Sequence, residues 1–210
     1  MLRLQFICSL FLVLCSCAAE KSPARRPASL AISEVKLPEG TSEPRSELIK
    51  SGLKLTKSHG WLKYKFGSAD PAKGGFDCSG ATFYLMSKAK LSPPRTSSAQ
   101  YLWVKDADRL HSVEKGITDL NDPAFSELKV GDLLFWAGTY KPTDGRKTKV
   151  THVAIYAGQD SEGRHIMLNS SNGRSYKGKR QNGYGVFDFR LPSAKSKSTF
   201  LGYGSPPGLN

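Results

Sequence analysis

The order of helix-like and strand-like segments constrains the fold of this chain most strongly. Residues 46–58 place Leu48, Ile49, Leu53 and Leu55 at helical spacing. From Gly131 onward the pattern changes to short β-rich segments between Gly, Asp or Ser turns, namely 132–136, 152–157, 166–170, 185–189 and 200–203. Helices followed by strands predict an α+β domain in which N-terminal helices pack on an antiparallel β-sheet.

Residues 1–19 have the pattern of a secretory signal peptide. Arg3 gives a positive start, and the apolar stretch 4–14 is too short to span a bilayer. Two cleavage patterns compete: Leu14-Cys15-Ser16-Cys17 resembles a lipoprotein box with Cys17 as the lipidated residue, whereas Cys17-Ala18-Ala19 suits ordinary signal peptidase. We expect export to the periplasm or cell envelope, and one of the two patterns adds membrane attachment through Cys17.

The rest of the chain divides into a linker and one domain. Residues 20–44 are rich in Pro, Ser, Ala and charged side chains, which predicts a flexible linker, and residues 45–210 form the domain. The net charge of +13 favours polyanions, and nucleic acid, anionic lipid and anionic wall polymers satisfy it equally. The sequence has no basic run of five and no zinc-finger or RNA-binding motif, so we expect no nucleic-acid partner.

Cys78 is the only cysteine beyond residue 17. It stands between the polar turn 73–75 and the apolar run 81–86, at the expected start of a helix with Asp77 as the N-cap. The backbone N–H groups and positive dipole of a helix start favour thiolate, the reactive form. A free cysteine is more often a small core residue, but a single unpaired thiol in an exported domain favours a nucleophile.

A cysteine nucleophile needs a base, and the histidines are the candidates. His59 follows the first helix and His111 lies in the charged segment 105–115, so both are expected at the surface. His152 opens the apolar strand 153–156, where a titratable side chain at the edge of the core suits a base. A partly buried histidine without function would show the same pattern.

Six short segments occur in an order typical of one enzyme family. They are Gly60-Trp61-Leu62-Lys63-Tyr64-Lys65-Phe66-Gly67, Phe76-Asp77-Cys78-Ser79-Gly80, Pro94-Arg95-Thr96-Ser97-Ser98-Ala99-Gln100, Val130-Gly131-Asp132-Leu133-Leu134-Phe135-Trp136, Thr151-His152-Val153-Ala154-Ile155-Tyr156-Ala157-Gly158 and Leu168-Asn169-Ser170-Ser171-Asn172-Gly173. This set resembles the NlpC/P60 family of cysteine peptidases and covers about Ile49 to Tyr203.

The resemblance implies a papain-like α+β fold and a set of site residues. Cys78 would be the nucleophile and His152 the base, while Tyr64 would donate its hydroxyl to the oxyanion beside the Cys78 N–H. Asn169 stands where the family has the polar residue that orients the imidazole, a role that Asn fills in Cys-His-Asn arrangements. His165 is the rival, because it lies four residues earlier on the same expected strand face.

Two further residues are predicted to bind substrate. By the same resemblance, Asp77 and Ser79 would hold the free amino end of the substrate peptide. The alternatives are structural: Asp77 would cap the helix, and Ser79 would pack in its first turn.

The family's best-known members cut peptidoglycan stem peptides, typically between D-glutamate, through its side-chain carboxyl, and diaminopimelate or lysine. We therefore expect a cell-wall hydrolase that acts as a monomer, without a metal or other cofactor. The alternatives are an N-acetylmuramoyl-L-alanine amidase of the same Cys/His type, a non-catalytic wall-binding module, and a hydrolase of lipid or other acyl substrates. The segment 95–130 is longer than usual, and we expect it either to wall the groove or to form an extra surface helix.

Overall fold

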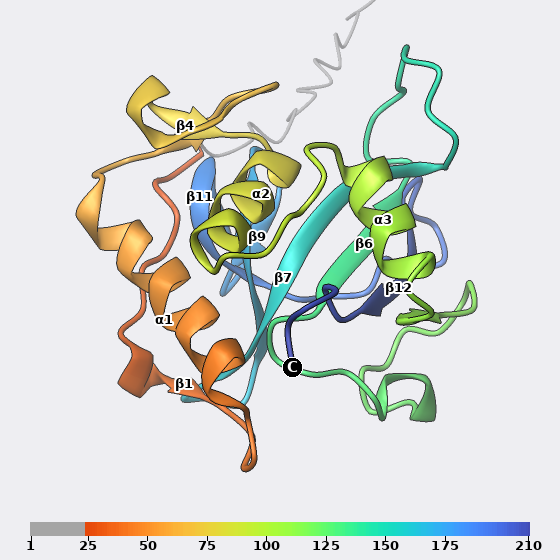
Figure 1. Cartoon of the computed structure of the whole chain (residues 1–210), viewed down its shortest axis with the longest axis horizontal. Helices are drawn as coiled ribbons and strands as arrows, with labels where there is room; N and C mark the ends of the chain where they lie inside the picture. The colour runs from red at the N-terminus through yellow and green to blue at the C-terminus, as the bar shows by residue number, and fades with distance from the viewer. Residues whose placement is uncertain (1–23) are drawn as a thin grey trace, which may run out of the picture.

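The computed structural model describes residues 24–210, so the predicted signal peptide lies outside the described residues. The centre of the domain is an antiparallel sheet with the strand order β11-β8-β7-β6-β12-β5, and β1 pairs with the far end of β7 (Figure 1). These strands are β1 (Val35–Lys36), β5 (Leu110–Ser112), β6 (Leu133–Ala137), β7 (Val150–Asp160), β8 (His165–Ser171), β11 (Gly183–Asp188) and β12 (Thr199–Gly204).

Residues 24–210 contain three α-helices, which lie in front of the sheet in the view of Figure 1, with α2 between α1 and α3. They are α1 (Glu43–Ser58), α2 (Cys78–Lys88) and α3 (Ser97–Lys105). Short elements complete the fold: β2 (Lys63–Tyr64), β3 (Ala69–Asp70) and β4 (Gly75–Phe76) form one small sheet, and β9 (Ser175–Tyr176) and β10 (Lys179–Arg180) form another. Three 3₁₀ helices are η1 (Ile32–Glu34), η2 (Pro71–Lys73) and η3 (Pro123–Phe125).

The central strands are buried on both faces. Successive side chains of a strand point to opposite faces, and β6 illustrates this alternation. Phe135 meets Tyr101 of α3 with ring centroids 5.3 Å apart. Its neighbour Trp136 packs instead against Phe189 and Phe200, at 6.0 and 5.1 Å. The core therefore has a helix-covered layer and an aromatic layer, with β6 and its neighbours between them.

The predicted fold class is confirmed, and each predicted helix and strand is present. The first helix extends from 43 to 58, and its predicted apolar side chains are buried. The five predicted strands correspond to β6, β7, β8, β11 and β12. The long segment 95–130 forms α3, the edge strand β5 and η3, whose Phe125 ring lies 5.8 Å from that of Tyr203 in the aromatic layer. The segment thus contains a partly buried helix, and the two roles expected for it stay predictions.

The flexible linker predicted for 20–44 does not describe residues 24–44. Arg25 and Ala28 form isolated bridges with Gln181 and Val186, and the Arg26 guanidinium donates to the Gly60 carbonyl at 2.9 Å. Val35 is buried where β1 pairs with β7. The composition was typical of a linker, but backbone pairing to the sheet gives these residues a fixed path along the domain.

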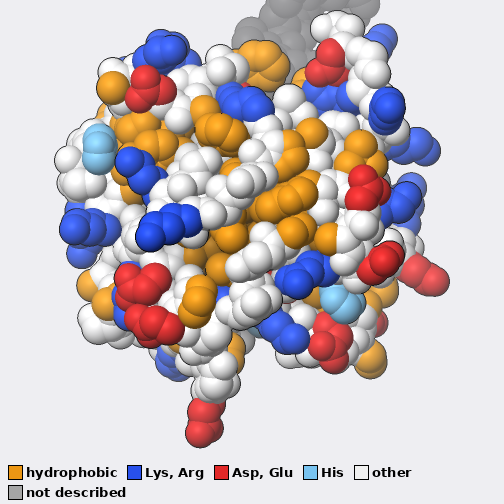
Figure 2. Space-filling view, in the orientation of Figure 1, with side chains coloured by type: hydrophobic (Ala, Val, Ile, Leu, Met, Phe, Trp, Pro, Cys, Tyr) orange, Lys and Arg blue, Asp and Glu red, His pale blue; other side chains and the backbone are white. Residues whose placement is uncertain are grey.

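The surface charge and the apolar character of the helices are relevant to the partners that the sequence predicts. Figure 2 shows Lys and Arg side chains spread around one face of the molecule, with Asp and Glu side chains among them. On this face the positive charge is not gathered into one patch. Within residues 24–210, no helix has both the length and the apolar character that crossing a bilayer requires.

A buried ion pair joins the first helix to the start of the sheet. Arg45 of α1 donates to the Asp132 carboxylate at 2.9 Å and to the Val130 carbonyl at 2.7 Å. The same guanidinium reaches Ser205, which donates to Asp132 at 2.6 Å. Asp132 also accepts the backbone N–H of Lys129. Removing one charge from such a pair leaves the other desolvated and unpaired.

We predict that Asp132→Ala lowers the free energy of unfolding by about 3–5 kcal/mol, because it strands the Arg45 guanidinium in the interior. Urea unfolding followed by circular dichroism measures the change. Glu127→Ala is the control, since Glu127 forms only an exposed 3.8 Å pair with Lys129. A loss for Asp132→Ala as small as that of the control would contradict the prediction.

Candidate active site

Cys78 is the first residue of α2, where the helix meets the central sheet. The side chain is 7% exposed. The backbone N–H groups of Val153, Ser79 and Cys78 itself all act to lower the pKa of the thiol. Because α2 packs against β7, and Val153 follows His152 on that strand, the thiol lies near the strand that carries the candidate base.

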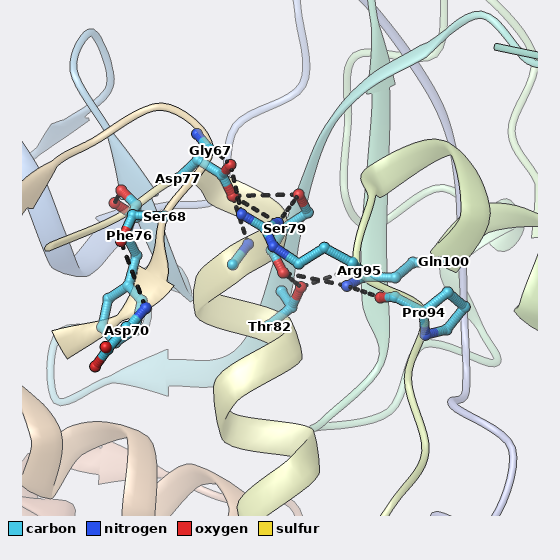
Figure 3. Close-up of polar contacts among 12 residues, drawn as sticks. Gly67, Ser68, Asp70, Phe76, Asp77, Ser79, Thr82, Pro94, Arg95 and Gln100 are labelled. Carbon is cyan, nitrogen blue, oxygen red and sulfur yellow. Dashed lines mark hydrogen bonds and ion pairs between the residues drawn. The ribbon is translucent and has the colours of Figure 1, made fainter. Parts of the chain in front are cut away.

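Asp77 holds the start of α2 in place. As the N-cap, it accepts the Gly80 N–H at 2.5 Å through Oδ1, and its Oδ2 accepts the Gly67 N–H at 2.8 Å. Arg95 donates to both oxygens, at 3.1 and 2.9 Å, and the Ser79 hydroxyl donates to Oδ1 at 3.2 Å (Figure 3). The capping role predicted as the alternative for Asp77 thus has these partners in the structure.

Ser79 lies in the same network. Its hydroxyl accepts from Arg95 at 3.0 Å, and its carbonyl accepts from Gln100 at 3.2 Å (Figure 3). Gln100 also donates to the Pro94 carbonyl at 2.9 Å, which ties the loop before α3 to the first turn of α2. A substrate amino group at Asp77 or Ser79 would have to compete with the Arg95 guanidinium, so their predicted substrate contacts remain predictions.

The residue two positions after the thiol must be glycine. A Cβ on Gly80 would lie 2.0 Å from the Ser68 carbonyl oxygen and 2.9 Å from the Asp77 carboxylate. Ser68 in turn accepts the Asp77 N–H at 3.0 Å. The close approach of this loop to the helix requires glycine and explains the Cys-Ser-Gly order.

His152 and Asn169 meet across neighbouring strands. His152 lies on β7, and its Nε2 is 2.8 Å from Nδ2 of the buried Asn169 on β8. In this amide orientation, Asn169 Oδ1 has no hydrogen-bond partner among the described residues. The reverse orientation presents Oδ1 to Nε2–H, which leaves the Nδ1 lone pair available as a base.

The other histidines lie elsewhere. His165, the predicted rival of Asn169, has its Nδ1 2.7 Å from the Tyr156 hydroxyl and its Nε2 3.1 Å from the Gln159 amide. His59 is exposed at the end of α1, and His111 is exposed on β5, as predicted. Of these histidines, His152 is the one that the structure brings to Asn169.

Tyr64 and His152 line one pocket of about 760 Å³. Tyr64 comes from β2, and burial raises the pKa of its phenol, with the negative charges of Cys78 and Asp77 acting in the same direction. The side chain therefore stays a hydroxyl donor at neutral pH. Within residues 24–210, no group of three or more His, Cys, Asp or Glu side chains is placed to hold a metal ion.

The thiol and the imidazole are both held in their uncharged forms. Burial raises the pKa of the Cys78 thiol to about 11, and the Asp77 carboxylate adds to this, although backbone N–H groups such as that of Val153 oppose it. Burial lowers the pKa of His152 well below its ordinary value, and the positive charge of Arg174 acts the same way. The helix start alone predicted a thiolate, but here desolvation outweighs the helix.

Arg174 is a residue of this site that the sequence did not point to. It follows β8, and its guanidinium lies 4.1 Å from the centroid of the Trp136 ring. Trp136 in turn meets the His152 ring edge-on at 5.6 Å. The loop 196–198 also borders this pocket. The contact of Arg174 with Trp136 and the position of loop 196–198 at the pocket each bring together segments far apart in the chain, so no local motif could have predicted them.

Comparison with known proteins identifies the family. The model of the NlpC/P60 family matches residues 60–186, which is more than half of the 210 residues. The chain belongs to the NlpC/P60 family. The match contains the thiol, the candidate base and Asn169, so the resemblance inferred from the six segments is confirmed.

Two curated relatives share this NlpC/P60 region. The bifunctional muramidase/DL-endopeptidase CwlT of Bacillus subtilis is 32% identical over 124 residues, which cover 59% of this chain and 30% of the relative. The probable endopeptidase p60 of Listeria monocytogenes is 31% identical over 125 residues, covering 59% of this chain and 19% of the relative. The chain thus corresponds to less than a third of either protein.

Solved structures of the family are also similar. An NLP/P60 family protein of Staphylococcus aureus, described as similar to lipoprotein, gives a TM-score of 0.49 at 21% identity and covers 83% of this chain and 44% of its own. The peptidoglycan hydrolase RipB of Mycobacterium tuberculosis gives a TM-score of 0.40 at 22% identity, covering 79% and 67%.

We predict that Cys78 is alkylated slowly at neutral pH and faster as the pH rises toward 11, because burial keeps the thiol protonated. The rate of iodoacetamide addition, followed by mass spectrometry of the peptide that contains Cys78, measures this. Dithiothreitol titrated in the same buffers corrects for reagent chemistry. A rate that is already constant between pH 6 and pH 8 would mean a resting thiolate and would contradict the prediction.

We also predict that Asp77→Ala lowers the free energy of unfolding by about 3 kcal/mol, since it removes a helix cap and leaves Arg95 without its carboxylate. Asp77→Asn is the matched control, because it keeps a side-chain oxygen for the Gly80 N–H. The control should lose less stability than Asp77→Ala in the same urea titration. Equal losses would show that capping contributes little.

Proposed function

We propose that residues 45–210 form a cysteine endopeptidase of the cell wall, which hydrolyses the amide between the side-chain carboxyl of D-glutamate and diaminopimelate or lysine in peptidoglycan stem peptides. The contact of Asn169 with His152, on the strand against which the Cys78 helix packs, carries this proposal. The names of the two curated relatives, a DL-endopeptidase and a probable endopeptidase, support it.

In the proposed reaction, His152 Nδ1 takes the thiol proton of Cys78 as the sulfur attacks the amide carbonyl. Transfer during attack suits the resting state, because both groups start uncharged. Asn169 Oδ1 accepts from Nε2–H and so holds the imidazole in the tautomer that has a free Nδ1. This is a positioning role, comparable to that of Asn in other Cys-His-Asn sites.

The negative charge that develops on the carbonyl oxygen needs donors. We assign this role to the Tyr64 hydroxyl and the backbone N–H of Cys78. The raised pKa of Tyr64 keeps the phenol proton in place as the oxyanion forms. His152 then protonates the leaving amine, and the acyl group stays on sulfur as a thioester. Water activated by His152 hydrolyses the thioester and regenerates the thiol.

We propose that this reaction takes place in the cell envelope after export. Residues 1–19 supply the signal peptide, and lipidation at Cys17 would anchor the protein. The net charge of +13 favours association with anionic wall polymers.

Digestion of purified muropeptides, read by mass spectrometry, tests the reaction. We predict products cut after D-glutamate for the wild type and none for Cys78→Ala, because the nucleophile is lost. His152→Ala should lower kcat/KM by about 10²–10⁴-fold, the usual contribution of a general base. Asn169→Ala should lower it less, because it only releases the imidazole.

His165→Ala is the matched control, since His165 is a half-buried histidine on the same strand as Asn169 with partners of its own. It should leave the rate nearly unchanged. If the products are free intact stem peptides, the enzyme is an amidase and not an endopeptidase. If the folded wild type gives no product, the non-catalytic wall-binding module is favoured. If His165→Ala loses activity and Asn169→Ala does not, His165 is the residue that orients the imidazole.

A further inference from the structure

Arg174 occupies a prominent place beside the proposed catalytic pair. Its guanidinium lies 4.1 Å from the centroid of the Trp136 ring, and the same ring also contacts the His152 imidazole. Arg174, Tyr64 and His152 line the same pocket of about 760 Å³. The side chain is partly buried, so it reaches the pocket without being freely solvated.

The charge of Arg174 is not balanced by the protein. Among residues 24–210, no carboxylate forms an ion pair with this guanidinium, and no side chain or carbonyl accepts a hydrogen bond from it. Other arginines of the pocket region are paired: Arg190 lies 3.1 Å from Asp188, and Arg146 lies 2.5 Å from Asp144. A partly desolvated cation without an anion is costly, and stacking on Trp136 offsets only part of that cost.

We propose that Arg174 binds a free carboxylate of the substrate peptide beside the scissile amide. This inference rests on the proposed function. A D-glutamate joined through its side chain keeps its α-carboxylate on the acyl side of the bond, and diaminopimelate carries an extra carboxylate on the amine side. A guanidinium fork held over an aromatic ring is suited to two parallel hydrogen bonds with such a group.

Binding there would also act on the base. The positive charge of Arg174 lowers the proton affinity of His152, as its effect on the His152 pKa indicates. A bound carboxylate would offset that charge, so the imidazole would accept the Cys78 proton more readily when the correct peptide is in place. Arg174 would then favour acidic substrates in two ways, by binding their carboxylate directly and by letting His152 accept the Cys78 proton more readily once that carboxylate is bound.

Four synthetic stem peptides test the inference: D-isoglutamate or D-isoglutamine on the acyl side, each with diaminopimelate or with its side-chain amide. The full-length wild type should cleave the acid form of one pair with a kcat/KM about 10–100-fold higher than the amide form, the range of a charge-assisted contact. Which pair shows the preference identifies the carboxylate.

Arg174→Gln should abolish this preference, so that the acid and amide peptides are cleaved with the same kcat/KM. Arg174→Lys should keep part of the preference, because it retains the charge but loses the fork. Lys179→Gln, on the exposed hairpin that follows Arg174 and outside the pocket, controls for net charge. Equal losses of Arg174→Gln on acid and amide peptides, or an unchanged preference, would overturn the inference.

Binding separates this inference from the proposed reaction. In the Cys78→Ala background, calorimetry should detect the acid peptide more tightly than its amide, and Arg174→Gln should remove the difference. If the wild type cleaves nothing but this difference persists, the proposed reaction fails and the carboxylate site stands. If neither peptide binds, or both bind alike, the carboxylate site fails.

Discussion

The Asp77 carboxylate is the constraint on which the rest of the site depends. A thiol at a helix start is useful only if that start is fixed, and Asp77 fixes it from three directions. It caps α2 at the Gly80 N–H, takes the Gly67 N–H from the loop that follows Tyr64, and pairs with Arg95 before α3. One buried side chain thus sets the relative positions of the nucleophile, the candidate oxyanion donor and the third helix.

The Asp77 carboxylate also disfavours the thiolate form of Cys78. Its negative charge, together with burial, keeps the Cys78 thiol protonated, whereas the helix start and the backbone N–H groups favour thiolate. His152 lies among Trp136, Asn169 and Arg174, none of which supplies a negative charge to stabilise an imidazolium. The site therefore rests as a neutral pair, and an ionised pair would form only as substrate charge enters the pocket.

The sequence predicted those parts of the site that local patterns encode. The helix start at Cys78, the capping by Asp77 and the strand that carries His152 follow from turn residues and periodicity, which act over a few residues. The sequence could not decide whether Asn169 or His165 orients His152, because residues an even number of positions apart lie on the same face of a strand. Asn169 and His165 lie four residues apart, roughly 13 Å along a strand, and only the pairing of β7 with β8 decides which one meets His152.

Arg174 and the 24–44 segment could not be predicted for a related reason. Arg174 contacts Trp136, which lies 38 positions earlier in the chain, and nothing in either local sequence indicates the contact. Residues 24–44 have the composition of a linker, and their order comes from pairing with residues more than 120 positions away. Composition reports local preference, whereas these features depend on where the sheet places distant strands.

The packed segment changes what a lipid anchor would do. Arg25 bridges Gln181, and the Gln181 N–H donates to the Arg174 carbonyl at 3.0 Å, so the first described residues lie beside the hairpin that carries Arg174. If Cys17 were lipidated, the seven residues 18–24 would reach only about 25 Å at full extension. A flexible tether of 25 residues would let the domain range through the wall. A tether of seven residues that joins the domain beside the Arg174 hairpin would restrict the proposed hydrolysis to peptidoglycan close to the membrane surface.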